Sequence, residues 1–365
     1  MFLLSSLKRL YVKRQIAKEQ KQEEYLVLKN FTPDNLEPLT ENEKKQVSNF
    51  LGDGDYKELG LFKKFNGFDP RYIPHRFYLP VLAHKLNDYQ YTKLFEHKSL
   101  LGVLTKGNLH FPYCYVRKIN GEYYSDNMNQ LTEDNAIKGC LSADCLIVKD
   151  SVNSSGGKSI EKISLQNQSE SEKRKILKHV FTERKQDFVI QECVEQSDKM
   201  SKFNSTSLNT LRITTLYLNG IFSVLNIVLR IGKNGMSVDN WGSGGIIIGV
   251  NLNGTVKGSG YDIALNKFHC QNEIEFQKET IEEIPKLLEL LEAEHKTNYS
   301  LCKLIGWDIC FDKNNEPIII ELNSSQPGLI GEQLCNGPIF GDRTQEVLDY
   351  CKNKKFNYNR SILKY

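Results

Sequence analysis

Two carboxylates and an amide near the end of the chain have the residue types and spacing of a metal site. The segment 305–322 reads as two apolar strands joined by a polar turn. If Asn314–Asn315 is a two-residue turn, Asp308 lies directly opposite Glu321. Asn323 then shares a face with Glu321, because alternate residues of a strand point the same way. Facing carboxylates repel unless a cation neutralises them, and oxygen ligands without histidine or cysteine are typical of Mg²⁺. The pattern predicts a magnesium site; the alternative is a solvated face of surface acids.

A lysine followed by a glycine-rich loop forms a second chemical pattern. The run 145–149 reads as a strand that ends at Lys149, and the loop after it contains serine and glycine at 154–157. Backbone N–H groups of such a loop can approach phosphate oxygens closely, and the lysine adds a fixed positive charge. The spacing is neither GxxxxGK[ST] nor GxGxxG. The alternative is an ordinary turn.

Two further strands end in, or contain, polar groups that suit a nucleotide. The run 187–193 is apolar, and its end at Gln191–Val194 can offer backbone groups to an adenine; alternatively it is an ordinary strand end. Arg212 lies inside the apolar run 210–217. A buried arginine needs an anion, which is either a phosphate or a structural carboxylate.

Polar residues flank this arginine strand and the strand after it. Asn209 stands at the strand mouth, and Arg230, Asp239, Asn240 and the WGSGG segment 241–245 follow the hairpin. These side chains either line the mouth of a substrate site or form turns.

The elements that must position these groups begin after a helical prelude. Residues 31–96 are polar and helix-like, with interruptions by proline and glycine, and β-rich runs alternate with helical stretches from about residue 98. Asn219–Gly220, between the runs 210–217 and 221–231, predicts a hairpin turn. Residues 277–296 carry charges and leucines at helical spacing and predict a helix.

Composition narrows the class of protein. The 365 residues carry 48 basic and 45 acidic side chains, and the net charge of +3 argues against a dedicated nucleic-acid binder. No apolar run approaches the length of about eighteen residues that a membrane span requires. Nine cysteines, without a CxxC pair, indicate reduced thiols in a reducing compartment, and we expect a cytoplasmic protein.

The first twenty residues combine an apolar helical stripe with basic side chains. The stripe is followed, rather than preceded, by the basic cluster, which argues against a signal peptide. Residues 1–20 predict a helix that lies on the inner face of an anionic membrane, and the alternative is a helix that docks on the rest of the protein. The basic side chains are Lys8, Arg9, Lys13, Arg14 and Lys18.

In order along the chain, these features resemble the ATP-grasp superfamily. The pattern is a first lysine, Lys98, then Lys149 with its loop, a hinge strand, an arginine strand, and finally the acidic hairpin. More narrowly, the segments NSTSLNTLRI, VDNWGSGG and IIELNSSQPG are similar to the sugar-transfer-associated ATP-grasp proteins of polysaccharide gene clusters. The resemblance covers roughly residues 60–345, and the segments before it lie outside the family pattern.

The resemblance implies an α+β fold in which two lobes clamp ATP, and it implies a role for each polar group. Lys98 and Lys149 would hold phosphates, the loop would close as a lid, and Arg212 would stabilise the transferred phosphoryl group with Arg230 beside it. Asp308, Glu321 and Asn323 would bind Mg²⁺. The implied nucleotide contacts beyond the lysines are Ser154, Ser155, Gly156, Gly157, Gln191, Glu192, Cys193, Val194 and Asp198, and the implied substrate contacts are Asn209, Asp239, Asn240, Ser243 and Gly244.

The implied activity is an ATP- and Mg²⁺-dependent carboxylate–amine ligase. It would join an amino acid or amine to a carboxylated sugar through an acyl-phosphate, in capsule or O-antigen synthesis. One alternative is a kinase of the same fold that phosphorylates a sugar hydroxyl, and another is a non-catalytic binding module. The expected units are the basic helix 1–30, a helical region 31–97, an N-lobe 98–190 with the lid loop, and a C-lobe 191–355 with the metal hairpin.

Overall fold

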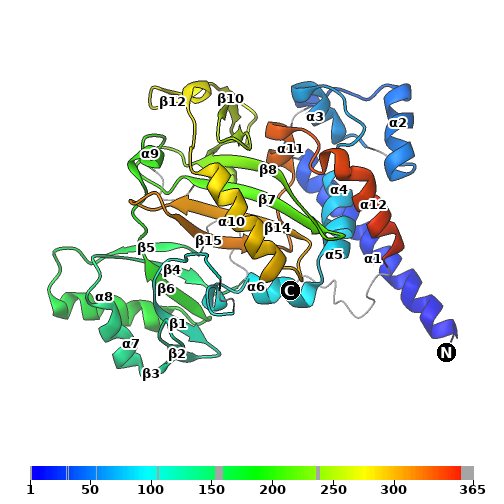
Figure 1. Cartoon of the computed structure of the whole chain (residues 1–365). Helices are drawn as coiled ribbons and strands as arrows, with labels where there is room; N and C mark the ends of the chain where they lie inside the picture. Colours follow the sequence, from blue (N-terminus) through cyan, green and yellow to red (C-terminus); the bar gives the residue numbers. More distant parts are fainter. Residues whose placement is uncertain are drawn as a thin grey trace.

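The fold consists of helices followed by two antiparallel sheets (Figure 1). The computed structural model describes residues 2–29, 31, 33–54, 56–104, 107–152, 159–235 and 239–354. One sheet has six strands and the other has seven, and further helices pack on them. This arrangement confirms the expected α+β class.

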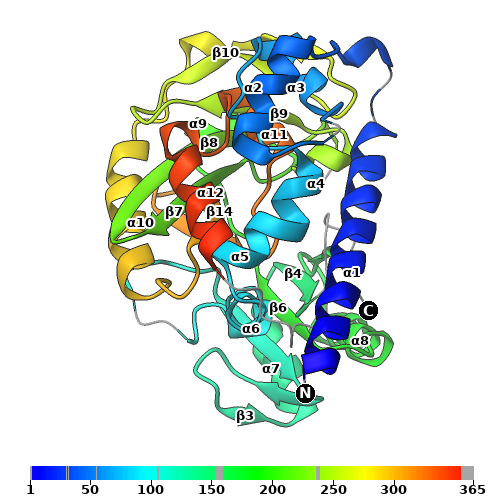
Figure 2. The same ribbon diagram turned by 90° about the vertical axis from the view of Figure 1, so that its right-hand side faces the viewer.

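The N-terminal region is helical, as the sequence predicts. The long helix α1 (Phe2–Leu28) runs beside α4 (Figure 2), and its second half is docked, because Glu23 and Val27 are buried and Glu24 pairs with Arg76 at 3.1 Å. Within the described residues, no helix is long and apolar enough to cross a bilayer. The following elements are η1 (Pro33–Asn35), α2 (Glu41–Leu51), α3 (Leu59–Asn66), α4 (His75–Phe77), η2 (Tyr78–Ala83), α5 (His84–Leu86), α6 (Tyr89–Phe95) and η3 (Lys98–Leu100).

The six-stranded sheet has the order β3-β2-β1-β6-β4-β5. Two of its strands match the sequence prediction, and helices α7 (Glu133–Cys140) and α8 (Glu170–Glu183) share its apolar core. Serine and glutamate at Ser169 and Glu172 form a capping box that fixes the start of α8. The strands are β1 (Cys114–Ile119), β2 (Glu122–Tyr124), β3 (Gln130–Leu131), β4 (Cys145–Asp150), β5 (Glu161–Ser164) and β6 (Phe188–Glu192).

The seven-stranded sheet has the order β11-β10-β9-β8-β7-β14-β15. The predicted turn at Asn219–Gly220 joins β7 to β8, and both residues have positive φ, at 54° and 80°. Positive φ at both central residues gives a two-residue turn whose twist matches the twist of the flanking strands. The strands are β7 (Thr210–Leu218), β8 (Ile221–Ile231), β9 (Ile246–Val250), β10 (Val256–Tyr261), β11 (Lys267–Phe268), β14 (Leu304–Phe311) and β15 (Pro317–Asn323); β12 (Cys270–Gln271) and β13 (Ile274–Glu275) form a separate pair.

Helix α10 (Ile284–Thr297) covers one face of this sheet and begins later than the sequence predicts. Pro285 lies in its first turn, where the missing N–H is tolerated, so the helix cannot extend back to 277. Leu287 and Leu291 of α10 pack on the sheet core, which includes Trp307. The other elements are α9 (Asp198–Ser201), η4 (Trp241–Ser243), η5 (Phe276–Lys278), α11 (Ile330–Asn336), η6 (Gly341–Arg343) and α12 (Thr344–Asn353).

Candidate functional site

The acidic hairpin places Asp308 directly opposite Glu321, as predicted. The predicted two-residue turn is wrong, however, because the amide of Asn315 bonds the carbonyl of Asp312 at 2.8 Å and Asn315 has a φ of 59°. This turn is one residue longer, and a β-bulge between Asp308 and Ile309 restores the expected pairing.

Asp308 is held between two guanidinium groups on the same sheet face. Arg212 donates to both of its oxygens, with Nη2 at 3.0 Å from Oδ2, and Arg230 Nη1 lies 3.2 Å from Oδ2. Burial works to raise the pKa of Asp308, but Arg212 and then Arg230 outweigh it and hold the pKa below its ordinary value. Of the two anions considered for Arg212, this structure supplies the carboxylate.

Two buried lysines complete the cluster. Lys98 Nζ lies 3.2 Å from Glu321 Oε1, and Lys149 at the end of β4 is 6% exposed. Burial lowers the pKa of Lys149 to about 8; Glu321 opposes this shift and Lys98 adds to it. Cations of the chain itself therefore lie against both facing carboxylates, so their charge is neutralised without a metal.

Glu96 fixes the loop after the hairpin and was not found from the sequence. Its Oε1 accepts from the backbone amides of Ser324 and Ser325, each at 2.6 Å, and the Ser325 hydroxyl lies 2.8 Å from Oε2. Lys98 follows two residues later and contacts Glu321. The segment 96–98 thus anchors both the loop after the hairpin and the Glu321 carboxylate. The sequence signal for Glu96 was its position two residues before the predicted site lysine, Lys98.

The candidate substrate residues divide into two groups. Asp239 is close to the cluster, because its carboxylate lies 3.0 Å from Arg230 and accepts from the Thr210 hydroxyl. Asn240 instead caps the turn of η4, accepting from the Gly242 amide at 3.2 Å, with Ser243 and Gly244 in the same turn.

Asn209 lies inside the loop that joins β6 to β7, and not at the predicted mouth of a substrate site. Its side chain is fully buried and donates to Gln196, Met200 and Asn204 at 2.7 to 3.0 Å. These donors hold the chain between β6 and β7 together, which explains why an asparagine precedes the arginine strand without facing the cluster.

The segment 191–194, which the resemblance identifies as the hinge, leaves the six-stranded sheet after Glu192. Gln191 and Glu192 still pair with β4, and the Glu192 carboxylate accepts from the Tyr113 amide at 2.8 Å. Cys193 and Val194 lie outside the strand. Asp198 begins α9 with an exposed side chain.

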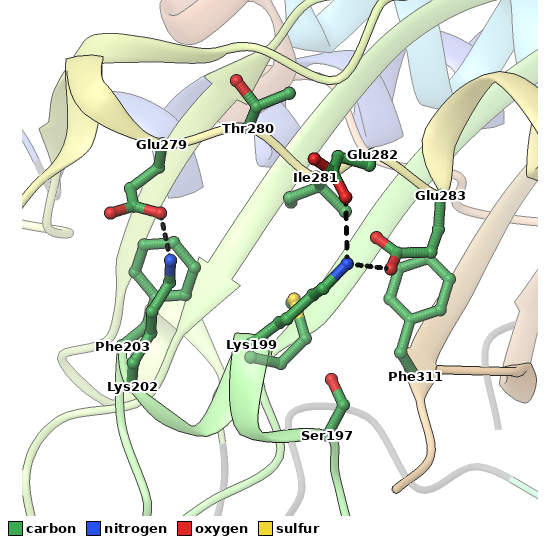
Figure 3. A pocket seen from close by; sticks show the side chains of 11 residues that line it. Ser197, Lys199, Lys202, Phe203, Glu279, Thr280, Ile281, Glu282, Glu283 and Phe311 are labelled. Atoms are coloured by element: carbon green, nitrogen blue, oxygen red, sulfur yellow. Dashed lines mark hydrogen bonds and ion pairs between the residues drawn. The ribbon is translucent and has the colours of Figure 1, made fainter. Parts of the chain in front are cut away.

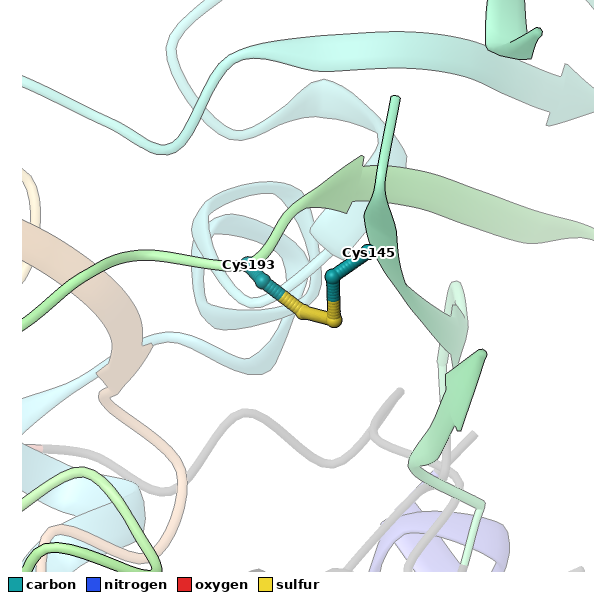
Figure 4. Close-up of a disulfide and its surroundings, with 2 residues drawn as sticks. All are labelled: Cys145 and Cys193. Atoms are coloured by element: carbon teal, nitrogen blue, oxygen red, sulfur yellow. A yellow bond between two sulfur atoms is a disulfide. The ribbon is translucent and has the colours of Figure 1, made fainter. Parts of the chain in front are cut away.

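Cys193 is joined to Cys145 by a disulfide (Figure 4). The register that pairs Leu146 with Glu192 brings the two cysteines opposite each other, with their Cα atoms 5.6 Å apart, within the range for a disulfide. The expectation of reduced thiols is therefore wrong for this pair and holds for the other seven cysteines. Sequence spacing could not show it, because the partners are 48 residues apart.

The predicted lid residues Ser154, Ser155, Gly156 and Gly157 lie outside the described residues. The strand that leads into them, β4, runs one residue beyond the predicted end at Lys149 and ends at Asp150.

A separate pocket of about 150 Å³ lies between α9 and residues 279–283 (Figure 3). Lys199 at its rim pairs with Glu282 and Glu283 at 3.1 and 2.8 Å. Phe311 in its lining lies three residues beyond Asp308 on β14 and so points to the other sheet face. None of the predicted phosphate or metal residues lines this pocket.

The oxygen donors fit a magnesium ion if the asparagine is counted. Asn323 Nδ2 lies 3.4 Å from Asp308 Oδ2, so the amide reaches the carboxylate pair. In the part of the chain that the structure describes, no group of three or more His, Cys, Asp and Glu side chains could hold a metal by itself. Two carboxylates, one amide and solvent are the donor set that Mg²⁺ accepts.

The protein thus has two large antiparallel sheets, and one sheet face carries a cluster of lysines, arginines and carboxylates. A family model described as sugar-transfer associated ATP-grasp matches residues 80–349. This match spans well over half of the 365 residues, so the chain belongs to that family, as its resemblance implied. No curated protein sequence matches the chain.

Solved structures similar to the chain include three ligase or carboxylase proteins. D-alanyl-alanine synthetase A from Vibrio cholerae has a TM-score of 0.42 and 12% identity, over 72% of this chain and 65% of that one. The biotin carboxylase domain of 2-oxoglutarate carboxylase from Hydrogenobacter thermophilus has a TM-score of 0.42 and 11% identity, over 73% and 47%. An L-amino acid ligase from Bacillus licheniformis has 0.36 and 12%, over 77% and 50%. The chain thus spans less than two thirds of each of these structures, and the family assignment rests on the family model.

Proposed function

We propose that the protein is an ATP- and Mg²⁺-dependent carboxylate–amine ligase. The observation that carries this proposal is the convergence of Lys98, Lys149, Arg212 and Arg230 on Asp308 and Glu321. Such a cluster suits phosphoryl transfer, which needs positioning and charge neutralisation more than a strong base. Family membership supports the nucleotide, and the H. thermophilus structure was determined with MgADP and bicarbonate.

Each part of the cluster has a task in this proposal. ATP supplies the phosphoryl group that activates a carboxylate, and Asp308, Glu321 and Asn323 would hold Mg²⁺. Lys98 and Lys149 bind phosphate oxygens, while Arg212 and Arg230 neutralise charge beside Asp308. The proposed N-lobe 98–190 and C-lobe 191–355 meet at this cluster.

The nucleotide's other contacts are proposed on either side of the cluster. Residues 154–157 would cover the phosphates and exclude water. The free backbone at Cys193 and Val194 would meet the adenine, and Asp198 the ribose. Asp239, which pairs with Arg230, would act on the carboxylate substrate through that arginine.

The family description, which associates these proteins with sugar transfer, supports a proposal for the substrate class. We infer a carboxylated sugar and an amino acid or amine as the pair that is joined, in capsule or O-antigen synthesis. A cytoplasmic enzyme with residues 1–20 on the inner membrane face would suit a sugar substrate that is lipid-linked or close to the membrane. The chain's small net charge does not favour a nucleic-acid partner.

The test is a screen of the purified chain with MgATP over pairs of amino acids and uronic acids. Release of both ADP and inorganic phosphate, dependent on both members of a pair, is the expected result. ADP release with the phosphate retained on a sugar would instead identify a kinase. A protein that binds MgATP without releasing ADP for any pair would contradict an enzymatic function in this substrate class, and Lys149→Met is the matched inactive control.

A further inference from the structure

One face of the seven-stranded sheet carries two neighbouring polar rows. The first row runs across Val228, Arg212, Asp308 and Glu321, which are paired from strand to strand. It contains three members of the charge cluster described above, Arg212, Asp308 and Glu321. The opposite face is apolar and lies under α10.

The second row runs across Asn226, Thr214, Gly306 and Asn323. Thr214 is fully buried and Asn226 is 6% exposed. Among the described residues, the Thr214 hydroxyl and both amide atoms of Asn226 have no hydrogen-bond partner. A buried polar group without a partner costs about 1–3 kcal/mol, so two side by side call for a binding role or for water.

A further unpartnered polar group among the described residues comes from the helical region before the sheets. Tyr78 is fully buried and its hydroxyl also lacks a partner within the described chain. Its ring packs in the cluster that contains Leu216, two residues beyond Thr214 on the same face. Glu332 and Arg212 are both near enough to act electrostatically on this hydroxyl, so Tyr78 lies in the neighbourhood of β7, which carries Arg212 and Leu216. Tyr78 begins a π-helical segment, a distortion that is frequent at functional sites.

Glu332 adds a second carboxylate near Arg212. It lies on α11 and is 8% exposed, and the charges of Arg212 and Arg230 act electrostatically on its carboxyl group. Gly328 packs so closely against its carboxyl group that a Cβ at 328 would lie 2.1 Å from Oε1. The neighbourhood of Arg212 therefore combines its guanidinium with a second carboxylate and with three neutral hydrogen-bonding side chains.

We propose that Tyr78, Thr214, Asn226 and Glu332 form the subsite for the amine acceptor, and that the acceptor is a small zwitterionic amino acid. Glu332 receives the ammonium group, Arg212 faces the carboxylate, and the hydroxyls and amide of the second row hold the remaining polar atoms. This inference rests on the proposed ligase function, because only a ligase has an amine acceptor. The subsite adjoins the charge cluster through Arg212, so a bound amine lies beside the activated carboxylate.

The double variant Thr214→Val plus Asn226→Leu tests the subsite, because it keeps volume while removing the unpartnered atoms. The probes are glycine, L-alanine, L-serine, L-glutamate and, as an amine without a carboxylate, ethanolamine. We expect at least one amino acid, and not ethanolamine, to raise the melting temperature of the full-length wild-type chain. We expect calorimetry to show that the variant binds the same amino acid at least about tenfold more weakly, with unchanged MgADP affinity.

The matched control is Thr215→Val, on the opposite face. The Thr215 hydroxyl bonds His295 Nδ1 and Trp307 Nε1, each at 2.8 Å, so this variant should lose stability and keep amino-acid binding. The double variant should keep or gain stability without ligand. A conservative Glu332→Gln should weaken the amino acid and leave MgADP binding unchanged.

Two results would overturn the subsite. In one, no probe stabilises the wild-type chain and the double variant is destabilised, which would assign the row to bound water. In the other, the amino acid binds both proteins equally. Amino-acid binding without any ADP release would leave the subsite standing and contradict the ligase proposal, so the two failures are distinguishable.

Discussion

Asp308 and Glu321 face each other across β14 and β15 only because a β-bulge corrects the register set by their turn. Near the turn, Phe311 pairs with Pro317, and without the bulge the same offset would place Glu321 one residue away from Asp308. A one-residue slip in either strand would turn a carboxylate to the apolar face under α10. The bulge is therefore as important to the site as the acids themselves.

Removing the charge of Glu321 should weaken nucleotide binding without unfolding the protein. The Glu321 side chain is 29% exposed, so Glu321→Gln leaves no deeply buried group unpaired except the Lys98 ammonium. A charge-assisted contact is worth about 1.5–3 kcal/mol, which predicts at least about a tenfold loss of MgATP affinity by calorimetry. Glu316→Gln, on the exposed turn of the same hairpin, is the control; equal affinities for the two variants would remove Glu321 from the site.

Lys149→Met should have opposite effects on stability and on binding. The lysine is buried and its pKa is lowered to about 8, so its charge is unfavourable in the protein without nucleotide. We expect the variant to unfold at higher denaturant concentration at pH 7 and to bind ATP at least about tenfold more weakly. Lys162→Met on β5, whose side chain is exposed, should change neither quantity. Unchanged ATP affinity in Lys149→Met would contradict a phosphate contact.

His295 should make the protein sensitive to acid. Burial lowers its pKa from 6.5 to about 4, and the neutral ring bonds Thr215 and the Cys302 carbonyl, each at 2.8 Å. Between these two pH values the unfolded chain binds a proton that the folded chain does not. Stability therefore rises with pH across this window and falls by about 3 kcal/mol as the pH drops through it.

Denaturant unfolding at several pH values measures this dependence. In His295→Gln, which cannot titrate, the slope assigned to this histidine should disappear, although the variant loses some packing at every pH. His179→Gln, on the exposed side of α8, should keep the wild-type slope. An unaltered slope in His295→Gln would show that other groups cause the acid sensitivity.

The basic N-terminal segment should bind anionic vesicles. Its five basic side chains within residues 1–20 each contribute about 1 kcal/mol near an anionic surface. Deleting residues 2–20 should abolish co-sedimentation with phosphatidylglycerol vesicles and leave the fold intact, because the shortened α1 keeps the docked contacts of Glu23, Glu24 and Val27. Phosphatidylcholine vesicles are the control. Equal sedimentation of the two proteins would make α1 a purely structural element.

Local patterns in the sequence predicted several of the strands, the hairpin turn at Asn219–Gly220, the strand that carries Lys149 and the types of residue at the site. The opposition of Asp308 and Glu321 was predicted as well, but from a two-residue turn that the structure does not have, and a β-bulge restores it. The late start of α10 was also encoded, by Pro285, although leucine spacing suggested a longer helix.

The tertiary structure alone decided how the charges are paired and what covers them. Arg212 and Asp308 are 96 residues apart in sequence, Lys98 and Glu321 are 223 apart, and Glu96 reaches Ser325 across 229. The Cys145–Cys193 bond and the packing of Tyr78 in one apolar cluster with Leu216 likewise depend on the register and packing of distant segments. Periodicity fixes which way a side chain points within its own element. Its partner is fixed only when burial brings separate elements together, because burial makes an unpaired charge too costly to keep.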